Sequence, residues 1–230
     1  MPFNSFLKGI FYKIKFSMKY LILVSIISLS LFACENQKDE SVSNIQEKIE
    51  LTTYQTGDIV FQTSTSSQSK AIQLATNSKY SHVGIIVNEQ NKLYVLEAVQ
   101  PVKLTLLNEW INRGKANHFV VKRLENADEI LTKNKIQKAV KVGKKMIGKN
   151  YDSAFEWSNK KIYCSELVWK IYKEGLNIKL CDLKKLKDFN LENEVVKAKL
   201  KERYGNKIPM NEKVVSPQDI FESKKLITIY

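Results

Sequence analysis

Three residues of the sequence have side chains that together could perform nucleophilic catalysis: Cys164, His82 and Glu97. Apolar residues recur at helical spacing after Cys164 and predict a helix over residues 163–172. A thiol at the N-terminus of a helix lies at the positive end of the helix dipole, which favours the nucleophilic thiolate. Because an isolated free cysteine is more often a small core residue, Cys164 indicates catalysis only together with a base.

His82 is the candidate base, and Glu97 is the candidate partner that orients it. His82 begins a β-branched run, from which a neutral imidazole could take the thiol proton and later pass it to a leaving group. His118 lies within another strand-like stretch and is the poorer candidate. Glu97 interrupts an apolar run, where a buried carboxylate needs a partner, and we expect it to accept from Nδ1–H of His82. The alternative is that Glu97 lies on the exposed face of a half-buried strand.

The elements that must position these residues can be predicted from the same patterns. Strands are expected near residues 59–61, 82–87, 93–99, 118–124 and 226–229. The second and third of these strands predict a hairpin with a four-residue loop at 88–91. Helices are expected at 67–77, 106–113, 128–146 and 163–172, and across most of 180–205. Ser216 and Pro217 predict the start of one further short helix.

Four blocks in this order resemble the YiiX/YebB-like group of permuted papain-like enzymes, relatives of the NlpC-type cell-wall amidases. The blocks read GDIVF at 57–61, YSHVGII at 80–86, YVLEA at 94–98 and YCSELV at 163–168. The resemblance covers residues 56–230. It implies an α+β fold in which a small antiparallel sheet packs on the helix that carries the cysteine. It also implies a circular permutation, which explains why the histidine precedes the cysteine.

The resemblance further implies a triad of Cys164, His82 and Glu97 that attacks an amide or ester carbonyl and forms a thioester. We expect a cysteine hydrolase of the cell envelope that cleaves an amide bond, with a peptidoglycan-type peptide as substrate. The backbone N–H of Cys164 and the hydroxyl of Tyr151 are the expected oxyanion donors, with Tyr163 as another choice for the hydroxyl. One alternative is a lipid-directed thiol acyltransferase or esterase, and another is a non-catalytic envelope-binding lipoprotein.

Several other polar residues are interpreted as structural. Asp58 follows Gly57 and is interpreted as part of a turn. The serine-rich stretch 64–69 could line the cleft, but a helix cap is the preferred interpretation. A helix between Cys164 and Cys181 would separate the two thiols by about 15 Å, too far for a disulfide. The histidines and cysteines are too scattered for a closed zinc site, so we expect neither a metal nor a cofactor.

The N-terminal region predicts a lipoprotein. Residues 21–32 form a short uncharged run after Lys19, and Leu31 to Cys34 resemble a lipobox. We expect a signal peptide at 1–33, lipidation of Cys34 and a polar tether over 34–55. Met18 is an alternative start of the signal peptide. The hydrolase domain then follows at 56–230. The alternative is an uncleaved membrane helix.

The net charge of the chain is +13, and it falls to +9 without the four lysines that precede Cys34. A basic surface favours anionic lipids or anionic envelope polymers, although a solvated lysine-rich surface explains it equally. We expect the protein to be anchored to a membrane of the bacterial envelope through Cys34. An exported protein rarely meets nucleic acid, so we expect no nucleic-acid partner, and no obligate protein partner is inferred.

Overall fold

The computed structural model describes residues 53–230. The predicted signal peptide, Cys34 and the tether up to residue 52 lie outside the described residues. The folded domain begins slightly before the predicted boundary at residue 56, because Tyr54 is buried. Its ring packs edge-on against Phe119 and Tyr230, with centroid separations of 6.4 and 6.2 Å.

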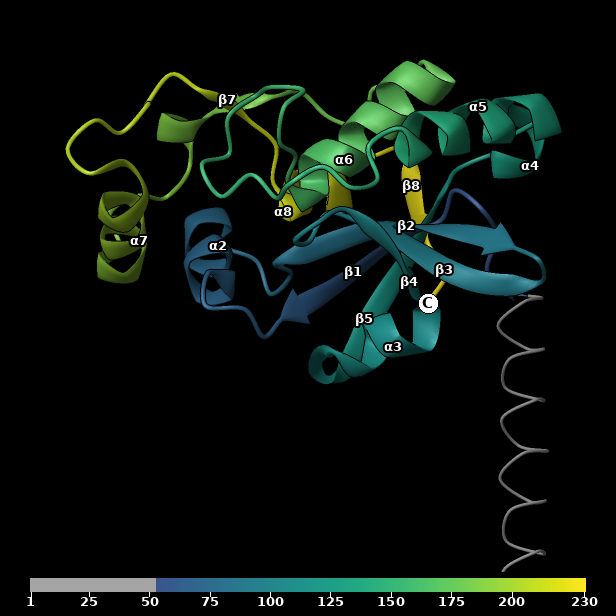
Figure 1. Cartoon of the computed structure of the whole chain (residues 1–230), viewed down its shortest axis with the longest axis horizontal. Helices are drawn as coiled ribbons and strands as arrows, with labels where there is room; N and C mark the ends of the chain where they lie inside the picture. Colours follow the sequence, from purple (N-terminus) through teal and green to yellow (C-terminus); the bar gives the residue numbers. More distant parts are fainter. Residues whose placement is uncertain (1–52) are drawn as a thin grey trace, which may run out of the picture. The chain divides into compact units, whose positions relative to one another are not determined.

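One antiparallel sheet of six strands forms the centre of the domain (Figure 1). Its order is β4-β3-β2-β1-β5-β8, and each neighbouring pair is antiparallel. The strands are β1 (Ile59–Ser64), β2 (His82–Glu89), β3 (Lys92–Glu97), β4 (Lys103–Leu106), β5 (Gly114–Leu124) and β8 (Leu226–Thr228). A separate ribbon pairs β6 (Lys184–Lys185) with β7 (Lys213–Val214). The antiparallel sheet agrees with the α+β fold expected from the sequence.

The hairpin of β2 and β3 is present, but its turn is shorter than predicted. Glu89 pairs with Lys92, which leaves only Gln90 and Asn91 between the strands. Both turn residues have positive φ angles, 52° and 60°. That conformation matches the twist of a tight two-residue hairpin turn. The prediction of a four-residue loop was therefore wrong, because polar residues at 88 and 89 continue the strand.

Helices cover both faces of the sheet (Figure 1). The helix α6 (Cys164–Lys170) and its π-helical continuation Ile171–Leu176 pack on one face together with α5 (Lys133–Lys144), whereas α3 (Leu107–Asn112) lies on the opposite side. At one end of the domain, α2 (Ser69–Thr76) packs beside α7 (Glu194–Tyr204). Two short helices, α4 (Ala127–Ile130) and α8 (Pro217–Phe221), complete this set.

Several helix predictions need correction. The helix expected over 128–146 is two helices, because Leu131 is non-helical and Thr132 caps α5 by accepting from the Lys135 N–H. The stretch 180–205 is helical only in α7 and in a 3-10 turn at Leu186–Asp188. The strand β4 was not predicted. The short helix α8 is confirmed, with Ser216 as its N-cap.

The core lies between the sheet and α6. Alternate residues of β1 and β2 face this helix, and Leu167, Val168 and Ile171 pack on them. The apolar strand residues in this core are Ile59, Phe61, Val83, Ile85 and Val87. Because α6 is anchored along its length, its first residue is held at a fixed place beside the sheet. Within residues 53–230, no helix is both long enough and apolar enough to span a bilayer.

Candidate active site

Cys164 is the first residue of α6, and the sequence around it fixes that helix end. The side chain of Glu166 accepts a hydrogen bond from the Tyr163 N–H at 3.4 Å, which caps the first turn. Glu166 is fully buried and forms an ion pair with Lys170 at 2.7 Å. Burial raises the pKa of Glu166 to about 7, although Lys170 opposes this shift. Cys164 is itself buried, at 2% exposed.

His82 lies beside Cys164 at the first position of β2, where it pairs with Gln62 of β1. Its Nε2 is 2.6 Å from Oε2 of Glu97. The Cys164 thiol lies close enough to the ring to raise the pKa of His82. The ring nitrogen expected to face Glu97 was Nδ1, so that detail is corrected. Since Nε2 is occupied by Glu97, Nδ1 is left for the thiol. The structure thus brings the three predicted residues together in the order thiol, imidazole, carboxylate.

Glu97 is completely buried and has three partners. Besides His82, it accepts from the Thr105 hydroxyl at 2.6 Å and from Nη2 of Arg113 at 2.5 Å to each oxygen. The alternative of an exposed strand residue is therefore excluded. The contacts of Thr105 and Arg113 with Glu97 were not predicted. Thr105 lies on the unpredicted strand β4, and Arg113 was interpreted as the end of a helix.

The charges in this cluster stabilise one another. Burial disfavours the imidazolium of His82, but hydrogen bonds to Cys164 and Glu97 outweigh burial and raise its pKa to about 9. Burial likewise opposes ionisation of Glu97, yet His82, Arg113 and Thr105 lower its pKa to about 2. At neutral pH the ring is therefore charged, whereas the sequence suggested a neutral imidazole. A buried imidazolium is suited to pair with a thiolate.

Two neighbours shape the space around the His82 ring. Trp110 of α3 is fully buried and lies nearly parallel to the ring, with centroids 6.1 Å apart. Gly84, two residues along β2, has no side chain where Val95 and Glu97 of β3 approach it. A Cβ atom on Gly84 would lie 2.3 Å from Cγ1 of Val95. Glycine is therefore required for β3 to place Glu97 against the histidine.

A polar cleft of about 360 Å³ opens at His82. It is lined by Gln62, Ser64, Ser66, Gln68, Gln100, Arg113 and Tyr151, among others. The interpretation of residues 64–69 as a helix cap was wrong, because no side chain caps α2 and both Ser64 and Ser66 line the cleft. His82 can therefore be reached through this cleft.

The two tyrosines considered as oxyanion donors differ in their surroundings. Tyr151 lines the cleft, and its hydroxyl accepts from Nε2 of Gln68 at 2.8 Å. Burial and the nearby charge of Cys164 raise the pKa of Tyr151. Tyr163 is buried in the core, where its hydroxyl accepts from the Val215 N–H at 3.2 Å. Tyr151 therefore remains the candidate donor, whereas Tyr163 has a packing role.

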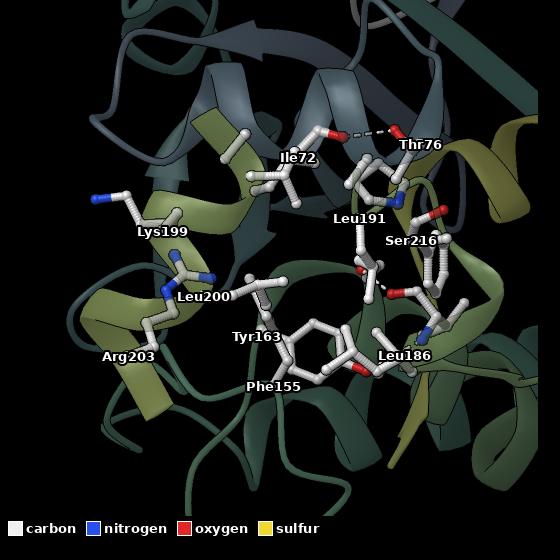
Figure 2. A pocket seen from close by; sticks show the side chains of 18 of the residues that line it. Ile72, Thr76, Phe155, Tyr163, Leu186, Leu191, Lys199, Leu200, Arg203 and Ser216 are labelled. Atoms are coloured by element: carbon white, nitrogen blue, oxygen red, sulfur yellow. Dashed lines mark hydrogen bonds between the residues drawn. The ribbon is translucent and has the colours of Figure 1, made fainter. Parts of the chain in front are cut away.

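A second, largely apolar pocket adjoins Cys164 (Figure 2). It measures about 80 Å³ and lies among α2, α7 and the segment 186–191. Figure 2 shows Ile72, Leu191 and Leu200 around it, with Lys199 and Arg203 extending from α7 at its edge. The polar cleft is thus lined by His82 and the apolar pocket by Cys164.

The remaining candidates lie away from this site. Asp58 forms an ion pair with Arg123 at 2.7 Å, which supports its structural interpretation. Cys164 and Cys181 are both free thiols, and burial raises the pKa of Cys181 to about 12. Trp157 and Trp169 pack on each other, with ring centroids 5.2 Å apart.

Comparisons with known proteins extend over the whole described domain. Residues 53–230 match the sequence model of a family described as permuted papain-like amidase enzymes, YaeF/YiiX, C92 family. An Escherichia coli K12 relative, described as uncharacterized protein YiiX, is 50% identical over 175 residues, which are 76% of this chain and 85% of the relative.

A solved structure is also similar. It is titled as the crystal structure of metalloprotein yiiX from Escherichia coli O157:H7, and it has 50% identity and a TM-score of 0.75. The match covers 77% of this chain and 97% of that one. Within residues 53–230 of the present chain, no group of three or more histidine, cysteine and acidic side chains is arranged to hold a metal ion. The residues described here therefore do not fit a metal centre.

Proposed function

The chain belongs to the C92 family of permuted papain-like amidases, and from this premise we propose that it hydrolyses an amide bond through Cys164, His82 and Glu97. The observation that carries the proposal is the contact of His82 with both other residues, the thiol on one side and the Glu97 carboxylate at 2.6 Å on the other. This is the geometry that a cysteine nucleophile, a proton carrier and an orienting carboxylate require.

The reaction begins with attack of the Cys164 sulfur on the carbonyl carbon of the substrate. The oxygen becomes an oxyanion, which in this proposal the N–H groups at the start of α6 and the Tyr151 hydroxyl stabilise. His82 then gives its proton to the leaving amine, and the C–N bond breaks to leave a thioester. Water attacks the thioester, His82 takes a proton from that water, and the carboxylic acid leaves.

Arg113, Thr105 and Trp110 support His82 in this sequence. Arg113 and Thr105 hold both oxygens of Glu97, so the carboxylate keeps its position when the charge of His82 changes. Trp110 covers the ring and limits its rotation. These residues position the proton carrier and do not touch the reacting carbonyl.

The decisive experiment compares the wild-type protein with Cys164→Ala and Cys164→Ser on bacterial wall peptides, with mass spectrometry of the products. We expect the wild type to add one water across an amide bond, and both variants to lose that activity by at least a thousandfold. Gln137→Glu, on the exposed side of α5, serves as the control. Equal product from wild type and Cys164→Ala would contradict the proposal and would favour a non-catalytic binding role.

The apolar pocket favours a second candidate, a lipid-directed esterase or acyltransferase. A pocket lined by Ala75, Leu200 and other apolar side chains beside the nucleophile could hold an aliphatic acyl group. A series of p-nitrophenyl esters from acetyl to octanoyl tests this candidate. If it is correct, kcat/KM rises with chain length, and Ala75→Leu, which fills part of the pocket, removes the rise. A flat series would favour the peptide amidase.

We also propose that the protein acts at the bacterial envelope, anchored through lipidated Cys34. The proposal is supported by the lipobox-like sequence that ends at Cys34 and by the basic composition of the chain. Expression of the full chain and of Cys34→Ala, followed by membrane sedimentation and mass spectrometry of the N-terminus, tests it. We expect the variant to leave the membrane fraction. An unmodified Cys34 in the wild type would contradict the anchor.

A further inference from the structure

Tyr151 is connected to α7 by two hydrogen bonds that pass through Gln68. Nε2 of Gln68 donates to the Tyr151 hydroxyl at 2.8 Å, and Oε1 of Gln68 accepts from Nη2 of Arg203. Gln68 directly precedes α2, and Arg203 lies in the last turn of α7, so each of the three side chains comes from a different segment. The Arg203 guanidinium packs over the Phe155 ring, with its Cζ atom 4.6 Å from the ring centroid.

The chemistry of these groups fixes the direction of both hydrogen bonds. A guanidinium has only donors, so Arg203 must face the oxygen of the Gln68 amide. The NH₂ group of the amide is then the part that faces Tyr151. Because this NH₂ group can only donate, the Tyr151 oxygen accepts, and its own proton is free to point elsewhere. Within residues 53–230, the hydroxyl proton has no acceptor.

The backbone of Tyr151 holds the hydroxyl near the nucleophile. Tyr151 forms a parallel bridge with Ile162, two residues before Cys164, and its N–H donates to Oε1 of Gln100 at 2.7 Å. Tyr151 lines the same cleft as His82, and it lies close enough to Cys164 for their charges to interact. The hydroxyl proton of Tyr151, which points away from Gln68, can therefore hydrogen-bond to a group in the cleft.

We propose that Gln68 and Arg203 are positioning residues that turn the Tyr151 O–H toward the oxyanion formed at Cys164. This inference rests on the proposed amidase function and assigns roles to two residues outside the triad. Arg203 orients the amide of Gln68, and the amide holds the tyrosine oxygen as an acceptor. The hydroxyl is then a prearranged donor, which costs no reorganisation when the oxyanion forms.

Substitution of Gln68 by glutamate provides a sharp test, because it keeps the size of the side chain and reverses its hydrogen bond to Tyr151. A carboxylate accepts from Arg203 as before, but it also accepts from the tyrosine and draws the proton out of the cleft. Arg203→Met removes the group that orients the amide. Gln137→Glu makes the same chemical change on the exposed side of α5 and is the matched control.

Two measurements separate a role in oxyanion binding from damage to the site. Hydrolysis of p-nitrophenyl acetate passes through an oxyanion, whereas alkylation of Cys164 by iodoacetamide does not. We expect Gln68→Glu and Tyr151→Phe to lower kcat for the ester by about 30-fold or more with little change in KM. Arg203→Met should lower kcat less. Alkylation should stay within about twofold of the wild-type rate, because the thiol and His82 are untouched.

The double variant Gln68→Glu with Tyr151→Phe should be no slower than Tyr151→Phe alone, because Gln68 acts only through the tyrosine hydroxyl. An additive loss in the double variant, an unchanged kcat in Gln68→Glu, or an equal fall in alkylation would each overturn the inference. Equal ester hydrolysis by wild type and Cys164→Ala would instead remove the proposed function, and the role of Gln68 with it.

Discussion

The raised pKa of His82 favours a positive charge on a side chain that is largely buried. Its ring lies between the Glu97 carboxylate and the Cys164 sulfur, and Trp110 covers one side. Removal of a charge from water is costly, and only opposite charges in contact offset that cost. The charged ring is therefore favoured more strongly in the folded protein than in the unfolded chain, and its stabilising effect should depend on pH.

The first prediction concerns the free energy of unfolding as a function of pH. The pKa of His82 is raised from 6.5 to about 9, so its stabilising contribution is complete below pH 6.5 and is lost as the pH rises through about 9. The contribution at low pH is on the order of 3 kcal/mol. Glu97→Gln should weaken this dependence of the free energy of unfolding on pH, because the variant removes the negative partner of His82. Urea denaturation at several pH values measures it.

The same variant should act on the acid side. The pKa of Glu97 is lowered to about 2, so its contribution is present above pH 4.5 and is lost as the pH falls through about 2. Glu97→Gln should flatten this slope as well, whereas the exposed Glu109→Gln should leave both slopes unchanged. If the stability of wild type and Glu97→Gln ran parallel from pH 2 to pH 10, the ion pair would not have the assigned energetic role.

The three predicted catalytic residues could be located from the sequence because each departs from its local pattern. Cys164 begins a helix, His82 begins a strand, and Glu97 is charged within an apolar run. Thr105 and Arg113 show no such departure, since a threonine in a strand and an arginine at a helix end are ordinary residues. Their importance arises from strand pairing, which brings them to a carboxylate 8 and 16 residues away.

At the level of the elements, the close approach of β2 and β3 depends on Gly84. The absence of a side chain there allows Val95 and Glu97 to lie over the strand that carries His82. This contact involves backbone as well as side chain, because a Cβ atom would also lie 3.1 Å from the carbonyl oxygen of Leu96. The strands would have to separate to admit even one methyl group.

The second prediction is that Gly84→Ala destabilises the protein by roughly 1–3 kcal/mol, as expected for overpacking in a buried sheet. Val95→Ala removes the side chain that the new methyl would meet first. The double variant should therefore lose less stability than the sum of the losses in the two single variants. Thermal and urea unfolding provide the measurements. A Gly84→Ala protein as stable as the wild type would show that the sheet can yield at this point.

The secondary structure was predictable where hydrophobic periodicity decides it and was missed where capping or pairing decides it. The run 82–87 is apolar enough to identify β2, and the helix that begins at Cys164 follows from its spacing. Hydrophobic periodicity predicted one continuous helix where the structure has α4 and α5. The separation of these two helices depends on the side chain of Thr132, which caps α5. The strand β4 has only four residues and exists because β3 offers an edge to pair with.

At the level of the whole molecule, the two ends of the described chain meet. Tyr54, near the first described residue, and Tyr230, the last residue, pack against each other and both contact Phe119 in β5. The predicted tether therefore includes at least one residue that is part of the folded domain. Burial of its aromatic ring should contribute to stability as a core residue does.

The third prediction is that Tyr54→Ala lowers the free energy of unfolding by about 3 kcal/mol, the usual size for removal of a buried aromatic side chain. Val195→Ala, at an exposed position on α7, is the control and should change stability by less than about 0.5 kcal/mol. Because Tyr54 lies outside the site, ester hydrolysis below the unfolding temperature should be retained. Equal stability of both variants would place residue 54 in the tether.

The permuted order of the chain separates the site into two consecutive stretches. His82, Glu97, Thr105 and Arg113 all lie within 32 consecutive residues, and Cys164 follows about fifty residues later. During synthesis this polar cluster is therefore made before the cysteine. If the proposed mechanism holds, Cys164 is an ordinary thiol in the growing chain and becomes reactive only when α6 packs on strands β1 and β2.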